Sequence, residues 1–93
     1  MKDHRYKAIK NLIQNNGVQG LKEIFTILPL SVVKEDMKVN YSTIRRRIEK
    51  GDLITIKDIL AMALLFDVEP AEVFRLIIND IKVKTTNSSK KNK

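Results

Sequence analysis

The spacing of the apolar residues is the feature of this sequence that most constrains its fold. Up to residue 81 they recur three and four positions apart, the period of a helix, and no stretch argues strongly for a sheet. The first stripe ends at the helix-stopping residues 15–17 and comprises Tyr6, Ile9, Leu12 and Ile13. The sequence therefore predicts an all-α fold, a compact bundle of five to six short helices.

Capping residues indicate where the later helices begin and end. Asn40 is a strong N-cap, and Gly51 is suited to follow the last residue of the same helix. Thr55, with Asp58 three residues on, predicts a capping box at the start of the next helix, and Pro70 suits the first position of the last one. The buried stripes expected on these two helices are Ile56, Ile59, Leu60, Ala63 and Leu64, and then Val73, Leu76 and Ile77.

The pattern describes one domain followed by a tail. Residues 1–81 are predicted to form a single helical domain, because the chain is too short for two cores. Residues 82–93 are predicted to be a disordered basic tail, because after Val83 no apolar residue offsets the entropy cost of ordering. The predicted parts of the domain are an extra N-terminal helix at about 4–15, a helix-turn-helix at about 30–50, and C-terminal helices at about 56–66 and 70–81.

The net charge of +7 is distributed unevenly along the chain. Residues 41–50 carry four cations and one acid, residues 51–80 carry two cations and six acids, and residues 81–93 carry five Lys and no acid. A basic excess makes nucleic acid the first partner to test. The charge map places the candidate DNA surface on residues 38–50, with the acidic half turned away or engaged with a partner.

Several function classes are excluded by what the sequence lacks. With no Cys and one His, it offers no disulfide framework, no thiolate nucleophile and no Cys/His zinc site. Acidic pairs such as Glu35-Asp36 diverge around a helix, and the three Gly form no phosphate-binding loop, so we expect no enzyme, metal or cofactor. No apolar run approaches the about 20 residues of a membrane span, and the N-terminus is too polar for a signal peptide. We therefore expect a cytoplasmic, nucleoid-associated protein without membrane contact.

The segment from Leu30 to Glu49 has the layout of a helix-turn-helix. A short helix carries Val33 and Met37, a tight turn covers residues 38–40, and a second helix starts at Tyr41. Apolar groups lie where the two helices would cross, and the outer face of the second helix stays free to enter a major groove.

At this point the sequence resembles the lambda-repressor-like (Cro/C1-type, XRE-like) helix-turn-helix proteins, over about residues 21–78. Residues 41–46 are similar to the start of the family's recognition helix, and residues 67–73 to the turn into its last helix. The resemblance implies a small bacterial or phage transcriptional regulator, repressor-like, that binds double-stranded DNA sequence-specifically with its 41–50 helix in the major groove.

Three residues depart from the family pattern. Lys34 stands where a small residue is usual, Lys38 where a turn glycine is usual, and Arg47 where an apolar residue is usual. Lys34 fits if its stem packs and its ammonium reaches water. A Lys with positive φ at the turn would cost about 1 kcal/mol or more.

The orientation of the second helix selects the candidate DNA contacts. At about 100° per residue, Arg46 and Ser42 lie opposite the inward Ile44, and both side chains can bond base edges. Tyr41 is either structural or a DNA contact, and Glu49 either restrains the arginines or accepts from cytosine. The alternative for the basic run is an ordinary solvated helix face. The candidate base contacts are Tyr41, Ser42, Arg45 and Arg46, and the candidate phosphate contacts are Lys38, Asn40, Thr43, Arg47 and Lys50.

The C-terminal helices carry more apolar residues than one core face needs. Phe74, Ile78 and Ile81 form a second stripe, to which Met62 and Leu65 add, and we expect these residues to form a two-fold homodimer interface. The alternative is that the extra N-terminal helix covers them. A second functional hypothesis is a protein-interaction module, or antitoxin-like adaptor, that docks a partner through the apolar C-terminal helix.

Overall fold

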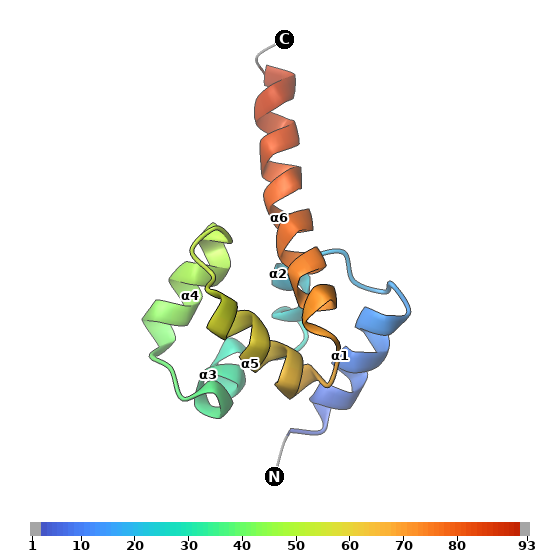
Figure 1. Ribbon diagram of the computed structural model, residues 1–93, viewed down its shortest axis with the longest axis vertical. Coiled ribbons are helices and arrows are strands. Elements are labelled where there is room, and N and C mark those ends of the chain that lie inside the picture. Colours follow the sequence, from blue (N-terminus) through green and yellow to red (C-terminus); the bar gives the residue numbers. More distant parts are fainter. Residues whose placement is uncertain (1–2, 92–93) are drawn as a thin grey trace.

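A computed structural model of the protein describes residues 3–91, with side chains described up to Lys82, and this part contains six α-helices and no strand (Figure 1). The prediction of an all-α fold is confirmed. The helices are α1 (Arg5–Gln14), α2 (Leu21–Ile24), α3 (Leu30–Met37), α4 (Tyr41–Lys50), α5 (Ile56–Phe66) and α6 (Pro70–Lys91).

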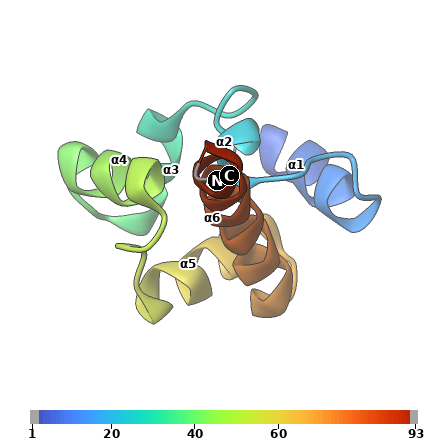
Figure 2. The same ribbon diagram turned by 90° about the horizontal axis from the view of Figure 1, so that it is seen from above.

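The helices pack around α5 and α6. α5 packs against α6 and α1, α3 packs against α4, and α2 lies against α6. Seen along α6, α4 and α1 lie on opposite sides of the molecule (Figure 2). The outer side of α4 is therefore left uncovered by the other helices.

α1 is an integral part of the core. Its Ile9 and Ile13 are completely buried, and its Tyr6 is 5% exposed. The Tyr6 hydroxyl donates to Asp36 Oδ2 at 2.6 Å, which joins α1 to α3. Burial, together with this hydrogen bond, raises the pKa of Tyr6, so the phenol remains a neutral donor. α1 thus covers part of the apolar surface of the domain.

The buried face of α5 differs from the predicted one. Ile59 and Ala63 are buried as expected, but Ile56, Leu60 and Leu64 are exposed by 70%, 54% and 76%. The reason is that Asp58, which is only 4% exposed, is turned inward. A helix that buries residue 58 also buries the residues four and eight positions later, which are Met62 and Phe66. Met62 therefore adds nothing to an exposed surface, contrary to the prediction.

α6 begins at Pro70 as predicted, and its Val73, Leu76 and Ile77 are buried as predicted. It ends at Lys91 rather than near residue 81. The predicted tail, residues 82–93, falls almost entirely outside the residues whose side chains are described, so its solvation stays a prediction. In the described part, none of the helices combines the length and apolarity needed to span a bilayer.

The short helix α2 is held in place by α6. The Asp80 carboxylate accepts hydrogen bonds from the backbone N–H groups of Leu21 and Lys22, at 3.0 and 3.2 Å. Asn79 donates to the Gln19 carbonyl at 2.9 Å. A Cβ at Gly20 would collide with the Asp80 carboxylate, so glycine at this position leaves room for that carboxylate to cap α2. These contacts satisfy N–H groups that a four-residue helix leaves unpaired.

α3, the turn and α4 fall on the residues for which a helix-turn-helix was predicted. The turn adopts the left-handed conformation at Lys38, with φ 58° and ψ 45°. The backbone N–H of Val39 then donates to the Lys34 carbonyl at 3.1 Å, which closes α3. Lys34 itself is partly buried, and its ammonium reaches Glu35 at 2.7 Å. Lys34 is thus accommodated by an ion pair inside α3, and Lys38 by a left-handed backbone conformation after it.

Replacing Lys38 with glycine should stabilise the protein by about 0.5–1 kcal/mol, because the strain of a left-handed Lys exceeds the entropy cost of glycine. Urea unfolding monitored by circular dichroism measures this change. Lys34→Gly is the control, since it places glycine inside α3, where a loss of about 1 kcal/mol is expected. A loss of stability in Lys38→Gly would show that the left-handed Lys is not strained.

Candidate nucleic-acid interface

α4 begins with the predicted N-cap. The Asn40 Oδ1 accepts from the backbone N–H of Ser42 at 2.9 Å and from that of Thr43 at 3.4 Å. The Ser42 hydroxyl also donates to the same oxygen, at 2.8 Å. Asn40 and Ser42 are therefore pre-positioned together at the start of the helix, and the prediction that Asn40 caps α4 is confirmed.

The orientation of α4 agrees with the prediction. Ile44 is completely buried and Ile48 is 7% exposed, so these two residues attach the helix to the core. Ser42 and Arg46 lie on the opposite face and are exposed. Tyr41, at the first position of the helix, is 44% exposed.

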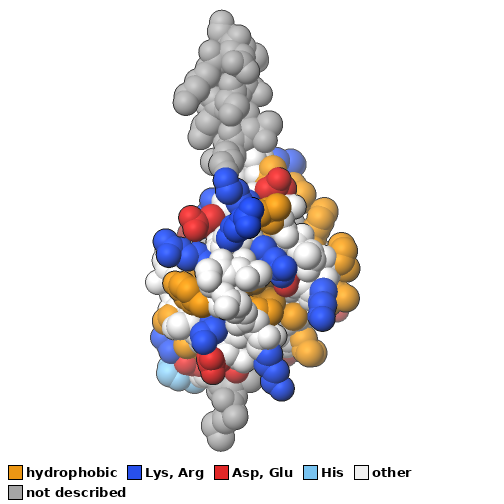
Figure 3. All heavy atoms as spheres, turned by 90° about the vertical axis from the view of Figure 1, so that its left-hand side faces the viewer, with side chains coloured by type: hydrophobic (Ala, Val, Ile, Leu, Met, Phe, Trp, Pro, Cys, Tyr) orange, Lys and Arg blue, Asp and Glu red, His pale blue; other side chains and the backbone are white. Residues whose placement is uncertain are grey.

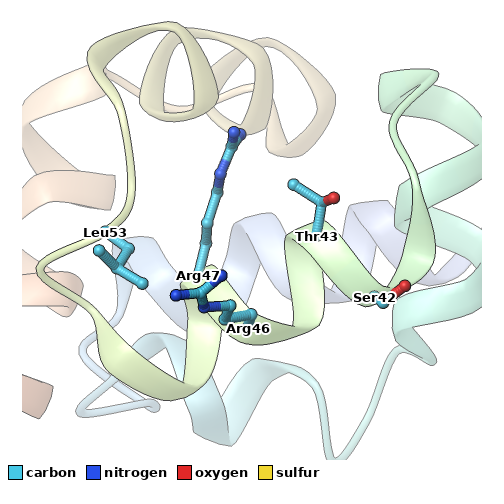
Figure 4. Close-up of a pocket in the computed structure, with 5 residues that line it drawn as sticks. All are labelled: Ser42, Thr43, Arg46, Arg47 and Leu53. Carbon is cyan, nitrogen blue, oxygen red and sulfur yellow. The ribbon is translucent and has the colours of Figure 1, made fainter.

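Two hollows flank Arg46 on the surface of α4. The larger, about 450 Å³, lies between α4 and the turn that precedes α5, and Figure 4 shows Arg46 and Arg47 pointing apart within it. The smaller, about 230 Å³, lies on the other side of the helix. Ser42 and Arg46 line both, so they form a ridge between two depressions. The larger is lined by Ser42, Thr43, Arg46, Arg47 and Leu53, and the smaller by Tyr41, Ser42, Arg45, Arg46, Glu49 and Lys50.

Arg47 is partly buried and is held by an ion pair within the protein. Its Nη1 lies 3.1 and 3.0 Å from the two carboxylate oxygens of Asp58, whose side chain is 5% exposed. The same carboxylate accepts from the Thr55 N–H at 3.1 Å, and the Asp58 N–H donates to the Thr55 hydroxyl at 3.1 Å. The predicted capping box is thus confirmed, and Arg47 extends it into a bridge from α4 to α5.

This bridge was missed by the sequence analysis, which assigned Arg47 to phosphate. Two features of the sequence could have indicated this bridge. Arg47 lies on the inward side of the helix, at a position where the lambda-repressor-like family carries an apolar residue. An acidic residue, Asp58, follows 11 positions later. The contact of Arg47 with phosphate stays an untested prediction, and we assign the residue a positioning role.

Arg45 is held only loosely. Its Nε lies 3.4 Å from Glu49 Oε1, one turn further along α4, and both side chains are 62% exposed. Exposed pairs of this kind contribute about 0.3–0.5 kcal/mol, so a ligand can displace Glu49 at little cost. Of the two roles considered for Glu49, this contact favours restraint of an arginine.

The remaining candidate residues lie at the two ends of α4. Lys38 lies in the turn before the helix, Thr43 lies near its start, and Lys50 is its last residue. All three side chains are exposed. Figure 3 shows Lys and Arg side chains spread over the side of the molecule that carries α4. The other candidate residues are thus all exposed on α4 or in the turn before it, whereas Arg47 is partly buried by its ion pair with Asp58.

The predicted dimer residues are only partly available. Phe74 is 50% exposed, whereas Ile78 and Ile81 are partly buried. The Ile81 side chain covers Gly51, which has φ 68°, in the turn after α4. Leu65 packs at the edge of the core. One residue of this second stripe, Ile81, thus supports the turn that follows α4.

Among the described residues, no group of three or more acidic, His or Cys side chains is arranged to hold a metal ion. In comparisons with known proteins, no family model, no curated protein and no solved structure matches this chain.

Arg47→Ala should lower the free energy of unfolding by about 1–2 kcal/mol, because it leaves the buried Asp58 carboxylate without its cation. Arg45→Ala removes the same side chain from an exposed pair, so it should cost less than about 0.5 kcal/mol. Urea unfolding of both variants measures the difference. Equal losses would contradict a structural role for the Arg47–Asp58 pair.

Proposed function

We propose that this protein is a sequence-specific double-stranded DNA-binding protein, a small repressor-like transcriptional regulator of the lambda-repressor-like class. It inserts α4 into the major groove, acts as a homodimer, and works in the cytoplasm on the nucleoid. The observation that carries the proposal is α4 itself: a capped helix, anchored by two buried isoleucines, whose outer ridge is Ser42 and Arg46. The proposal includes no catalytic activity, metal or cofactor.

The size of α4 suits a major groove. A helix of 10 residues is about 15 Å long, and the groove is about 12 Å wide and admits one helix. Because the ridge stands between two hollows, both of its side chains are accessible from outside the protein. Arg46 can donate two hydrogen bonds to guanine O6 and N7, and Ser42 can donate or accept at a neighbouring base. Tyr41 and Arg45 line the smaller hollow and can reach adjacent base edges.

The ends of α4 supply phosphate contacts. Lys38 lies in the turn before the helix and Lys50 at its last position, so the two cations are separated by the length of α4. A helix lying in the groove with a cation at each end meets the backbones that border the groove. Thr43 and the Asn40 amide group add neutral donors near the start of the helix. These contacts fix the register of the protein without reading sequence.

A second candidate function is a protein-interaction module, or antitoxin-like adaptor, that docks a partner through its C-terminal helices. The observation that favours it is the exposure of Phe74 on α6, together with that of three aliphatic residues on α5. The two functions differ in their response to duplex DNA, since an adaptor of this kind requires no affinity for it.

Selection of bound sites from a random duplex pool should yield a palindromic site for the full chain. Against that site, Arg46→Ala should weaken binding by about 1–3 kcal/mol and relax the preference at one base position in each half-site. Lys50→Ala should instead weaken binding to all sequences alike and lower the slope of log K against log salt by about 1. Fluorescence anisotropy titrations over a salt series measure both effects.

Lys7→Ala is the charge-matched control, because Lys7 is exposed on α1, on the opposite side of the molecule from α4. It should leave affinity and base preference unchanged. The proposal is wrong if the full chain binds no duplex DNA at low salt. The assignment of Arg46 is wrong if its removal changes neither affinity nor base preference.

A further inference from the structure

The larger hollow beside Arg46 has one hydrocarbon wall. Of the five described residues that line it, only Leu53 has a side chain without a polar atom. Leu53 is 40% exposed, and Figure 4 shows its side chain directed from the turn after α4 towards Arg46 and Arg47. The smaller hollow is lined by charged and polar side chains and by Tyr41. The two sides of the ridge formed by Ser42 and Arg46 therefore differ in chemistry.

The turn that carries Leu53 is held by the protein, while the Leu53 side chain is left outside the core. The backbone N–H of Ile54 donates to the Gly51 carbonyl at 3.1 Å, which closes the turn. Ile54 then packs against the core, whereas Leu53 is exposed. Leu53 is thus presented to solvent from an anchored turn, and core packing does not require a leucine at this position.

The larger hollow is less polar than its residue types suggest. Arg47 lines it, but the Arg47 guanidinium is paired with the Asp58 carboxylate at 3.0 Å, so its charge is compensated from within the protein. A hydrocarbon group that enters the hollow on the Leu53 side therefore does not displace water from an unpaired cation there. In the smaller hollow the same group would lie among Arg45, Glu49 and Lys50, whose hydration it would reduce at a cost.

If α4 lies in a major groove, one group on the base edges complements a leucine. The edges present hydrogen-bond donors and acceptors, to which a hydrocarbon side chain offers nothing, and thymine in addition presents its C5 methyl group. Contact between this methyl group and a leucine removes apolar surface of both from water, which is favourable.

We propose that Leu53 is a specificity-determining residue that contacts the C5 methyl group of one thymine in each half-site. This inference rests on the proposed function, since it requires α4 to lie in the major groove. Adjacent base pairs are about 3.4 Å apart, and Arg46 and Leu53 border one hollow. The thymine therefore lies at most about two base pairs from the guanine that Arg46 contacts, on the side of the ridge that faces α5.

Replacement of thymine by deoxyuridine, which lacks only the methyl group, tests the proposal. The probe is the palindromic site selected by the full chain, with each thymine replaced in turn, and fluorescence anisotropy measures the affinity. One position in each half-site, at most about two base pairs from the guanine whose preference depends on Arg46, should be sensitive. Replacement there should weaken binding about three- to fivefold, the loss expected for one buried methyl group.

Leu53→Ala should weaken binding to the thymine site, and it should bind the thymine and deoxyuridine sites equally. Leu60→Ala is the matched control, because Leu60 is a 54% exposed leucine that does not line the hollow. This control should keep the affinity and the deoxyuridine sensitivity of the unmodified protein. Far-ultraviolet circular dichroism establishes that both variants are folded.

Binding that is insensitive to every deoxyuridine replacement would overturn the proposal, as would a sensitivity that persists in Leu53→Ala. Either result would leave the DNA-binding proposal standing, because that proposal is tested by Arg46→Ala at the guanine position. A full chain that binds no duplex DNA would overturn both, so the two failures are distinguishable.

Discussion

The Arg47–Asp58 pair is the contact on which the geometry of the candidate interface depends. One carboxylate caps the start of α5, is buried against the core and binds an arginine of α4. Because a buried carboxylate is stable only when it is paired, α4 and α5 are constrained to one relative orientation. That orientation directs Arg46 outward, and it also determines which side of α5 is left exposed.

Features that depend on local chemistry could be predicted from the sequence. The Asn40 cap and the Thr55–Asp58 capping box require only backbone groups two or three residues away, so their residue types are sufficient evidence. The inward direction of Ile44 follows in the same way from helical periodicity. The class of fold and the orientation of α4 therefore follow from residue types and their spacing alone.

Features that depend on contacts between distant segments could not be predicted. The apolar pattern of α5 allows two buried faces, and the choice between them is made by a polar residue, Asp58, bound to another helix. Hydrophobicity alone selected Leu60 and Leu64 for the core, whereas both are exposed. The DNA contacts and the homodimer remain proposals, because they concern partners outside the chain.

The attachment of α2 to α6 has a consequence for the order in which the chain folds. Four residues are too few to form a stable helix alone, and the groups that cap α2 lie 58 and 59 residues later in the sequence. During synthesis, the segment after α1 must therefore wait until residue 80 has left the ribosome. A chain that ends earlier would lack the cap of α2, so a contact that becomes available late in synthesis secures a helix in the N-terminal third of the protein.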